Sequence, residues 1–89
     1  MATPTKADFD DRNKRLLRSH KHYQASVDKD IDQIKDIVAN ALKDGGITEA
    51  TIESMAAVFR GYEYIKPIAD KAWEAYEDHC TTFGYDIQY

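Results

Sequence analysis

The sequence predicts an all-α protein, an antiparallel hairpin of two long helices that self-association completes to a bundle. No glycine or proline occurs between residues 6 and 44, and the apolar residues there recur at spacings of three, four or seven. A glycine pair at residues 45–46 interrupts this pattern, and a second helical periodicity covers residues 48–83. Only 17 of the 89 residues are Leu, Ile, Val or Phe. One copy therefore has little material for a core of its own, which favours association.

The first helix is expected over residues 6–44, after an N-terminal arm formed by residues 1–5. Thr5 is placed to cap its first turn, and Asp8 is the reciprocal member of a capping box. Gly45 supplies the left-handed residue that ends the helix. Its apolar stripe contains Phe9, Leu16, His20, Tyr23, Val27, Ile31, Ile34, Val38, Ala41 and Leu42.

The second helix is expected over residues 48–83, with Thr48 as its cap. Its apolar stripe shifts by roughly one residue between an early set that includes Ile52, Met55 and Phe59 and a later set that begins at Tyr62. Pro67 falls near this shift, so we expect a kink at residues 61–67. A full break, which would allow a three-helix monomer, stays open as an alternative. Residues 84–89 alternate apolar and polar side chains, as a short strand or a docked extended tail does.

A basic segment at residues 12–22 contains no acidic residue. Its candidate contacts to phosphate groups or to an acidic partner are Arg12, Lys14, Arg15, Arg18 and Lys21. Folding the chain about residues 45–46 places this segment beside residues 69–79, so four acidic residues could neutralise it instead: Asp70, Glu74, Glu77 and Asp78. The net charge of −4 and a pI near 5.2 weigh against general affinity for nucleic acids.

Eight of the ten aromatic residues lie from Phe59 onward. They either fill a core that lacks leucine, or they form a binding surface, because Tyr and Trp are enriched at interface hot spots. In the second interpretation the partner-binding residues lie around the kink and in the tail: Tyr62, Tyr64, Ile65, Ile68, Tyr85, Ile87 and Tyr89.

Catalytic and metal-binding patterns are weak, and we expect no catalytic residue, no metal site and no cofactor. The row Asp28, Asp32 and Asp36 resembles half of a helical magnesium site, but alternating lysines favour a solvated face. His20 and His22 point to opposite sides of a helix, so they make a poor metal pair. His20 is expected in the core or an interface, and Cys80 as a small buried apolar residue.

The resulting hypothesis is a single domain, residues 1–89, that acts as a small non-enzymatic protein-binding module. It would occlude or bridge a partner protein, in the manner of the inhibitors and adaptors of phages and mobile elements. The expected partners are an unidentified protein and a second copy, with a homodimer favoured. A cytoplasmic location is expected because the sequence shows one cysteine, no signal core and no membrane span. Two alternatives stay open: a nucleic-acid-binding helical dimer that uses the basic segment, and a carboxylate–metal nucleotide hydrolase.

Overall fold

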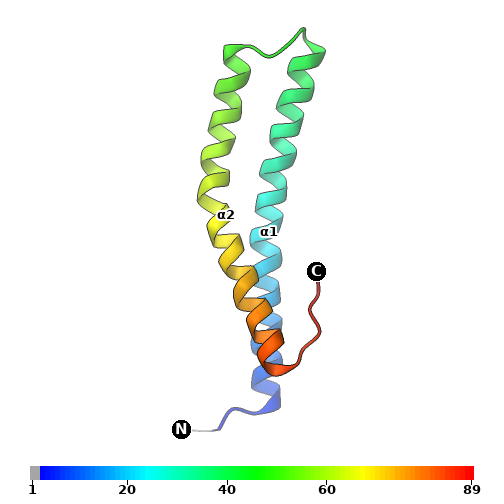
Figure 1. Cartoon of the computed structure of the whole chain (residues 1–89), viewed down its shortest axis with the longest axis vertical. Helices are drawn as coiled ribbons and strands as arrows, with labels where there is room; N and C mark the ends of the chain where they lie inside the picture. Colours follow the sequence, from blue (N-terminus) through cyan, green and yellow to red (C-terminus); the bar gives the residue numbers. More distant parts are fainter. Residues whose placement is uncertain (1–2) are drawn as a thin grey trace.

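The chain folds as an all-α hairpin of two long antiparallel helices, as the sequence predicts. A computed structural model describes residues 3–89, and the first two residues of the expected N-terminal arm lie outside this range. Helix α1 spans Lys6–Lys43 and helix α2 spans Glu49–Phe83 (Figure 1). Residues 3–89 contain no strand, and the molecule measures 63 × 22 × 15 Å.

The caps are as predicted, and the helix boundaries agree with the expected ones to within one residue, since α1 ends at Lys43 and α2 begins at Glu49. The Thr5 hydroxyl accepts a hydrogen bond from the Asp8 amide, while the Asp8 carboxylate accepts one from the Thr5 amide. Thr48 and Thr51 form the same reciprocal box at the start of α2. These pairs satisfy backbone N–H groups that the first helical turn leaves without a partner.

Glycines occupy the sharp turns at the ends of both helices. Gly45 and Gly46 have φ values of 113° and 132° in the connection between the helices. Gly84 ends α2 in the left-handed conformation with φ 74°. L-residues with a side chain adopt these angles only at a cost, so glycine directs the chain at both points.

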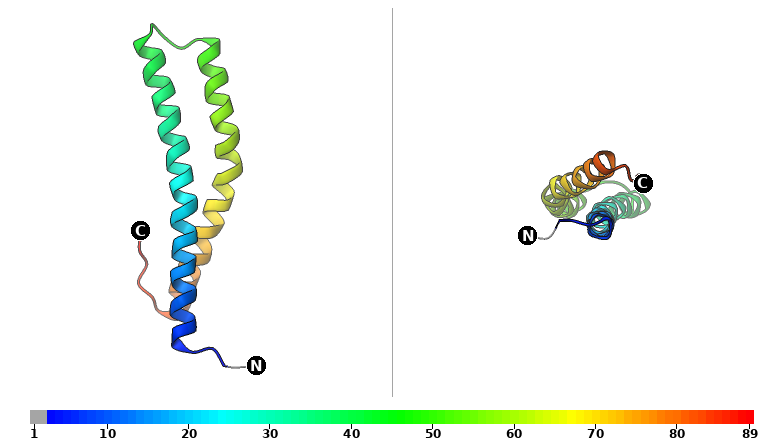
Figure 2. Two further views of the ribbon diagram at one scale, coloured as in Figure 1. Left: turned by 180° about the vertical axis from the view of Figure 1, so that it is seen from behind. Right: turned by 90° about the horizontal axis from the view of Figure 1, so that it is seen from below.

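Helix α2 continues through Pro67, so the structure excludes the break that the sequence left open. The helix changes direction in the yellow segment around residues 60–70 (Figures 1 and 2). Proline removes one backbone hydrogen bond and crowds the preceding turn, which accounts for a bend at this place. The expected kink is present, and it occurs within one continuous helix.

The two helices meet through inner positions whose steps alternate between four and three residues along each helix. In α1 these positions are 9, 13, 16, 20, 23, 27, 30, 34, 37 and 41, and in α2 they are 51, 55, 58, 62, 65, 69, 72, 76, 79 and 83. All of them except the terminal Phe83 are buried or half-buried. Alternating steps of four and three are the repeat of a coiled coil. The repeat passes Pro67 without a slip, so the predicted one-residue shift of the stripe is wrong.

The core lies in the half of the hairpin that is distant from the turn. Its fully buried side chains are Tyr76, Val27 and Cys80, with Ala69, His20 and His79 beside them. The ring of His20 lies 4.7 Å from that of Trp73, and Phe9 packs against Phe83 at the same centroid distance. These contacts confirm that residues 12–22 lie beside residues 69–79.

Over residues 3–89, neither α1 nor α2 combines the length and the apolar character needed to span a bilayer.

Candidate functional site

The C-terminal tail, residues 85–89, runs back along the N-terminal half of α1 and is docked there (Figure 2). The Tyr85 hydroxyl donates a 2.6 Å hydrogen bond to the Asp10 carboxylate, which raises the pKa of Tyr85 to about 12. The backbone N–H of Gln88 donates to the Tyr76 hydroxyl at 3.0 Å. Burial of the Tyr76 phenol raises its pKa. The expectation of a docked extended tail is therefore confirmed, and no strand forms.

A small polar cluster lies under the tail. The Asn13 amide nitrogen lies 3.0 Å from His79 Nδ1 and donates to Cys80 Sγ at 3.2 Å. Cys80 is fully buried, as predicted. Within residues 3–89, His20 Nδ1 and His79 Nε2 are buried without a hydrogen-bond partner, and such nitrogens cost stability. His20 is thus a core residue as expected.

A second row of residues runs beside the inner positions on each helix, at spacings of seven. It contains positions 10, 17, 24, 31 and 38 in α1 and positions 52, 59, 66, 73 and 80 in α2. A spacing of seven keeps residues on one side of a coiled-coil helix. Two shallow hollows show that both rows belong to one face of the hairpin: one joins Gln24 to Lys66 and Trp73, and the other joins Ile31 to Phe59.

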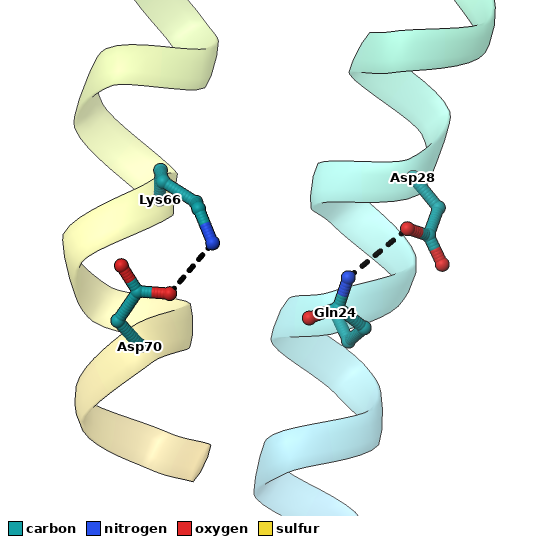
Figure 3. A network of polar contacts seen from close by, with 4 residues as sticks. All are labelled: Gln24, Asp28, Lys66 and Asp70. Atoms are coloured by element: carbon teal, nitrogen blue, oxygen red, sulfur yellow. Dashed lines mark hydrogen bonds and ion pairs between the residues drawn. The ribbon is translucent and has the colours of Figure 1, made fainter. Parts of the chain in front are cut away.

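The tail covers only the turn-distal half of this face. It contacts Asp10 at one end, and the Tyr89 ring reaches Trp73 with 5.6 Å between centroids. Just beyond Tyr89, each helix carries one polar pair along its own length, Gln24 with Asp28 on α1 and Lys66 with Asp70 on α2 (Figure 3). The hydrogen bond to Asp70 raises the pKa of Lys66.

Beyond this polar border the face carries mainly apolar side chains, with Lys35 beside Ile31 and Phe59, and no other part of residues 3–89 covers it. We call this part the open face, and it contains Ile31, Val38, Ile52 and Phe59 of the second row, with Leu42 one helical turn after Val38. The exposed fractions of four of these side chains are 36% for Ile31, 63% for Leu42, 57% for Ile52 and 43% for Phe59. Exposed apolar side chains gathered on one surface are typical of sites that contact proteins, membranes or ligands.

The turn-proximal half also lacks a buried core. No residue between positions 28 and 68 is buried, although the inner positions there include Ile34, Val58 and Ile65. The chain exposes 6845 Å² in total. A compact monomer of 10.2 kDa would expose roughly 5,300 Å². The hairpin thus has an excess of roughly 1,500 Å², close to the total area that a standard protein interface removes from both partners.

The structure does not gather the predicted partner-binding residues into one surface. Tyr62 and Ile65 lie at inner positions, half-buried between the helices. Tyr64 is 75% exposed and lies off both the inner positions and the open face. The other members are half-buried or exposed at separate places: Ile68 on α2, and Tyr85, Ile87 and Tyr89 in the docked tail.

The basic segment stays on the surface of α1. All five of its candidate contact residues are exposed: Arg12, Lys14, Arg15, Arg18 and Lys21. Within residues 3–89 only two ion pairs form, Arg15 with Asp11 and Lys66 with Asp70, each inside one helix. The neighbouring helix therefore neutralises none of these basic side chains through an ion pair.

The aspartate row of α1 contains no assembled metal site. Asp28, Asp32 and Asp36 are exposed, and Asp28 accepts a hydrogen bond from Gln24. No three His, Cys, Asp or Glu side chains of residues 3–89 lie together in a way that would hold a metal ion.

Sequence reasoning did not identify the open face, although a signal for it was present. Ile31 and Val38 share one apolar stripe with the inner positions of α1, because an arc of about 100° contains both rows. Separating the steps of four and three from the steps of seven would have shown two rows.

No protein-family model matches the chain, and no curated protein or solved structure is significantly similar to it.

Proposed function

We propose that this chain is a non-enzymatic protein-binding module and that the open face is its contact surface. The observation that carries the proposal is that the tail ends at Trp73, while the same face continues beyond it with apolar side chains that nothing else in residues 3–89 covers. Occlusion or bridging of a partner requires a contact surface of this kind and no catalytic group.

The size of the surface is consistent with binding. The exposed parts of Ile31, Leu42, Ile52 and Phe59 together equal about two whole side chains. Burial of a large apolar side chain contributes about 1.5–3 kcal/mol, so these four residues would contribute about 3–6 kcal/mol. Half-buried Val38 and the hollow between Ile31 and Phe59 would add shape complementarity.

The test compares charged substitutions on and off the face. Tagged protein carrying Ile52→Glu or Phe59→Glu is compared with wild type in affinity capture, with Tyr64→Glu as the matched control. The control side chain is large and exposed but lies outside the open face. We expect the two face variants to lose bound proteins that the control retains. Loss in the control alone would assign binding to the aromatic surface predicted from the sequence, and equal retention in all three would refute the proposal.

One observation favours a second candidate, binding to nucleic acid or to another polyanion. Arg12, Lys14, Arg18 and Lys21 are exposed and form no ion pair within residues 3–89. Phosphate contacts of this kind lose affinity steeply as salt rises. Titration of labelled DNA and RNA at low and at physiological salt tests this candidate. Absence of binding at low salt, or binding that Lys14→Glu and Arg18→Glu leave unchanged, would refute it.

A further inference from the structure

We propose that the open face is occupied by a second copy of this chain, packed so that the two turns lie at opposite ends of the dimer. The inference rests on the proposed function, because it names the partner of the same face. Two observations carry it: the area that the hairpin leaves exposed, and the place where the tail stops.

The area fits an interface between two copies. The excess exposure of roughly 1,500 Å² per chain exceeds the roughly 800 Å² that each partner contributes to a standard interface. In a two-fold dimer the same face serves both copies, so every apolar residue on it is used twice. Two hairpins joined in this way give four helices around one core, which supplies the burial that residues 28–68 lack.

The tail decides the relative orientation of the copies. The tail lies on the same face as the open face and next to it, with Tyr85 against Asp10 of α1 and Tyr89 against Trp73 of α2. If both turns lay at one end, the two tails would meet and hold the open faces apart. If the turns lie at opposite ends, each open face covers the other, and each tail lies beyond the turn of its neighbour.

This orientation predicts the length of the dimer. The open face extends over residues 28–45, or roughly 27 Å of helix at 1.5 Å per residue. Two molecules 63 Å long that overlap by this amount give a particle of about 100 Å. A dimer with both turns at one end would stay close to the 63 Å of a single hairpin.

The experiment combines sedimentation over a wide concentration range with small-angle X-ray scattering on the whole chain. We expect a dimer with twice the 10.2 kDa chain mass and a maximum dimension of about 100 Å. Ile52→Glu and Phe59→Glu should each raise the dissociation constant roughly 100-fold or more, because symmetry brings two substituted side chains into every interface. Tyr64→Glu should leave it unchanged, and circular dichroism should show that all three variants keep their helix content.

Each other result counts against the inference. A monomer at all concentrations, a dimer near 63 Å, or a dimer insensitive to both face variants would overturn it. Its failure can be distinguished from failure of the proposed function. A monomer whose captured proteins are lost on Phe59→Glu retains the protein-binding function with a different occupant, whereas variants that alter neither capture nor association refute both.

Discussion

Substitution of Tyr76 tests whether the turn-distal core holds the hairpin together. Its side chain is 0% exposed, its ring stacks on His20 at 6.1 Å, and it lies 5.9 Å from Trp73. Its hydroxyl oxygen accepts a hydrogen bond from the backbone N–H of Gln88, with 3.0 Å between nitrogen and oxygen. This bond attaches the tail to the core. Replacement by alanine removes the packing and the attachment, and replacement by phenylalanine removes the attachment alone.

The two substitutions differ in expected magnitude. Truncation of a buried aromatic side chain to alanine costs about 3–5 kcal/mol, because it leaves a cavity and removes ring contacts. A protein of this length has a free energy of unfolding of roughly 4–13 kcal/mol, so Tyr76→Ala removes a large part of it. Tyr76→Phe should cost only about 0.5–1.5 kcal/mol, because water can replace the phenol as acceptor for the exposed Gln88.

Urea unfolding followed by circular dichroism measures both effects, at one low protein concentration so that association contributes equally. We expect the midpoint to fall by at least about 1 M for Tyr76→Ala and by much less for Tyr76→Phe. Tyr64→Ala is the control, because a 75% exposed side chain should change stability by no more than about 0.5 kcal/mol. Equal destabilisation by Tyr76→Ala and Tyr64→Ala would refute the assignment of the core.

Three further predictions concern the tail, the bend and the polar cluster. The Tyr85 pKa of about 12 lies above its ordinary value near 10, so the contribution of the Tyr85–Asp10 hydrogen bond to tail docking should be complete below pH 10 and lost as the pH rises through about 12. In a tyrosinate absorbance titration, Asp10→Asn should return one tyrosine to a pKa near 10, and an unchanged titration would contradict the hydrogen bond. Pro67→Ala should raise the free energy of unfolding by about 1–3 kcal/mol in urea, because the helix interior regains a backbone donor; no gain would mean that the bend carries no strain. Asn13→Ala should lower the free energy of unfolding by about 1–3 kcal/mol, because His79 Nδ1 loses the Asn13 amide as its hydrogen-bond donor. Wild-type stability of this variant would show that the contact contributes nothing.

The sequence was sufficient to predict the helices, their caps and the antiparallel register. These features depend on local signals, such as the Thr5–Asp8 pair and the glycines at 45–46, and on chain geometry once the turn is located. The buried state of His20 and Cys80 followed from their place on the stripes, and it is confirmed.

The division of apolar residues between two faces was harder to predict. Ile52 and Phe59 produce the apparent slip of the second stripe, because they belong to the open face and not to the inner positions. Periodicity reports which side of a helix is apolar, but it does not report how many neighbours that side contacts. Contacts that distinguish the second row from the inner positions, such as Trp73 with Tyr89, depend on where the tail docks. No local sequence signal encodes the docking position of the tail.

The position of the core at the turn-distal end has a consequence for the order of folding. A helical hairpin with good packing near its turn can zip up from the turn, because each new contact closes only a short loop. Here the tight contacts join residues far apart in sequence, 66 positions for Asn13 with His79 and 75 for Asp10 with Tyr85. A single copy must close these long loops before burial stabilises it, so it should fold slowly for a two-helix protein. In the monomer, amide hydrogen exchange should for the same reason be fastest near the turn at residues 45–46, the reverse of the fraying expected at chain termini.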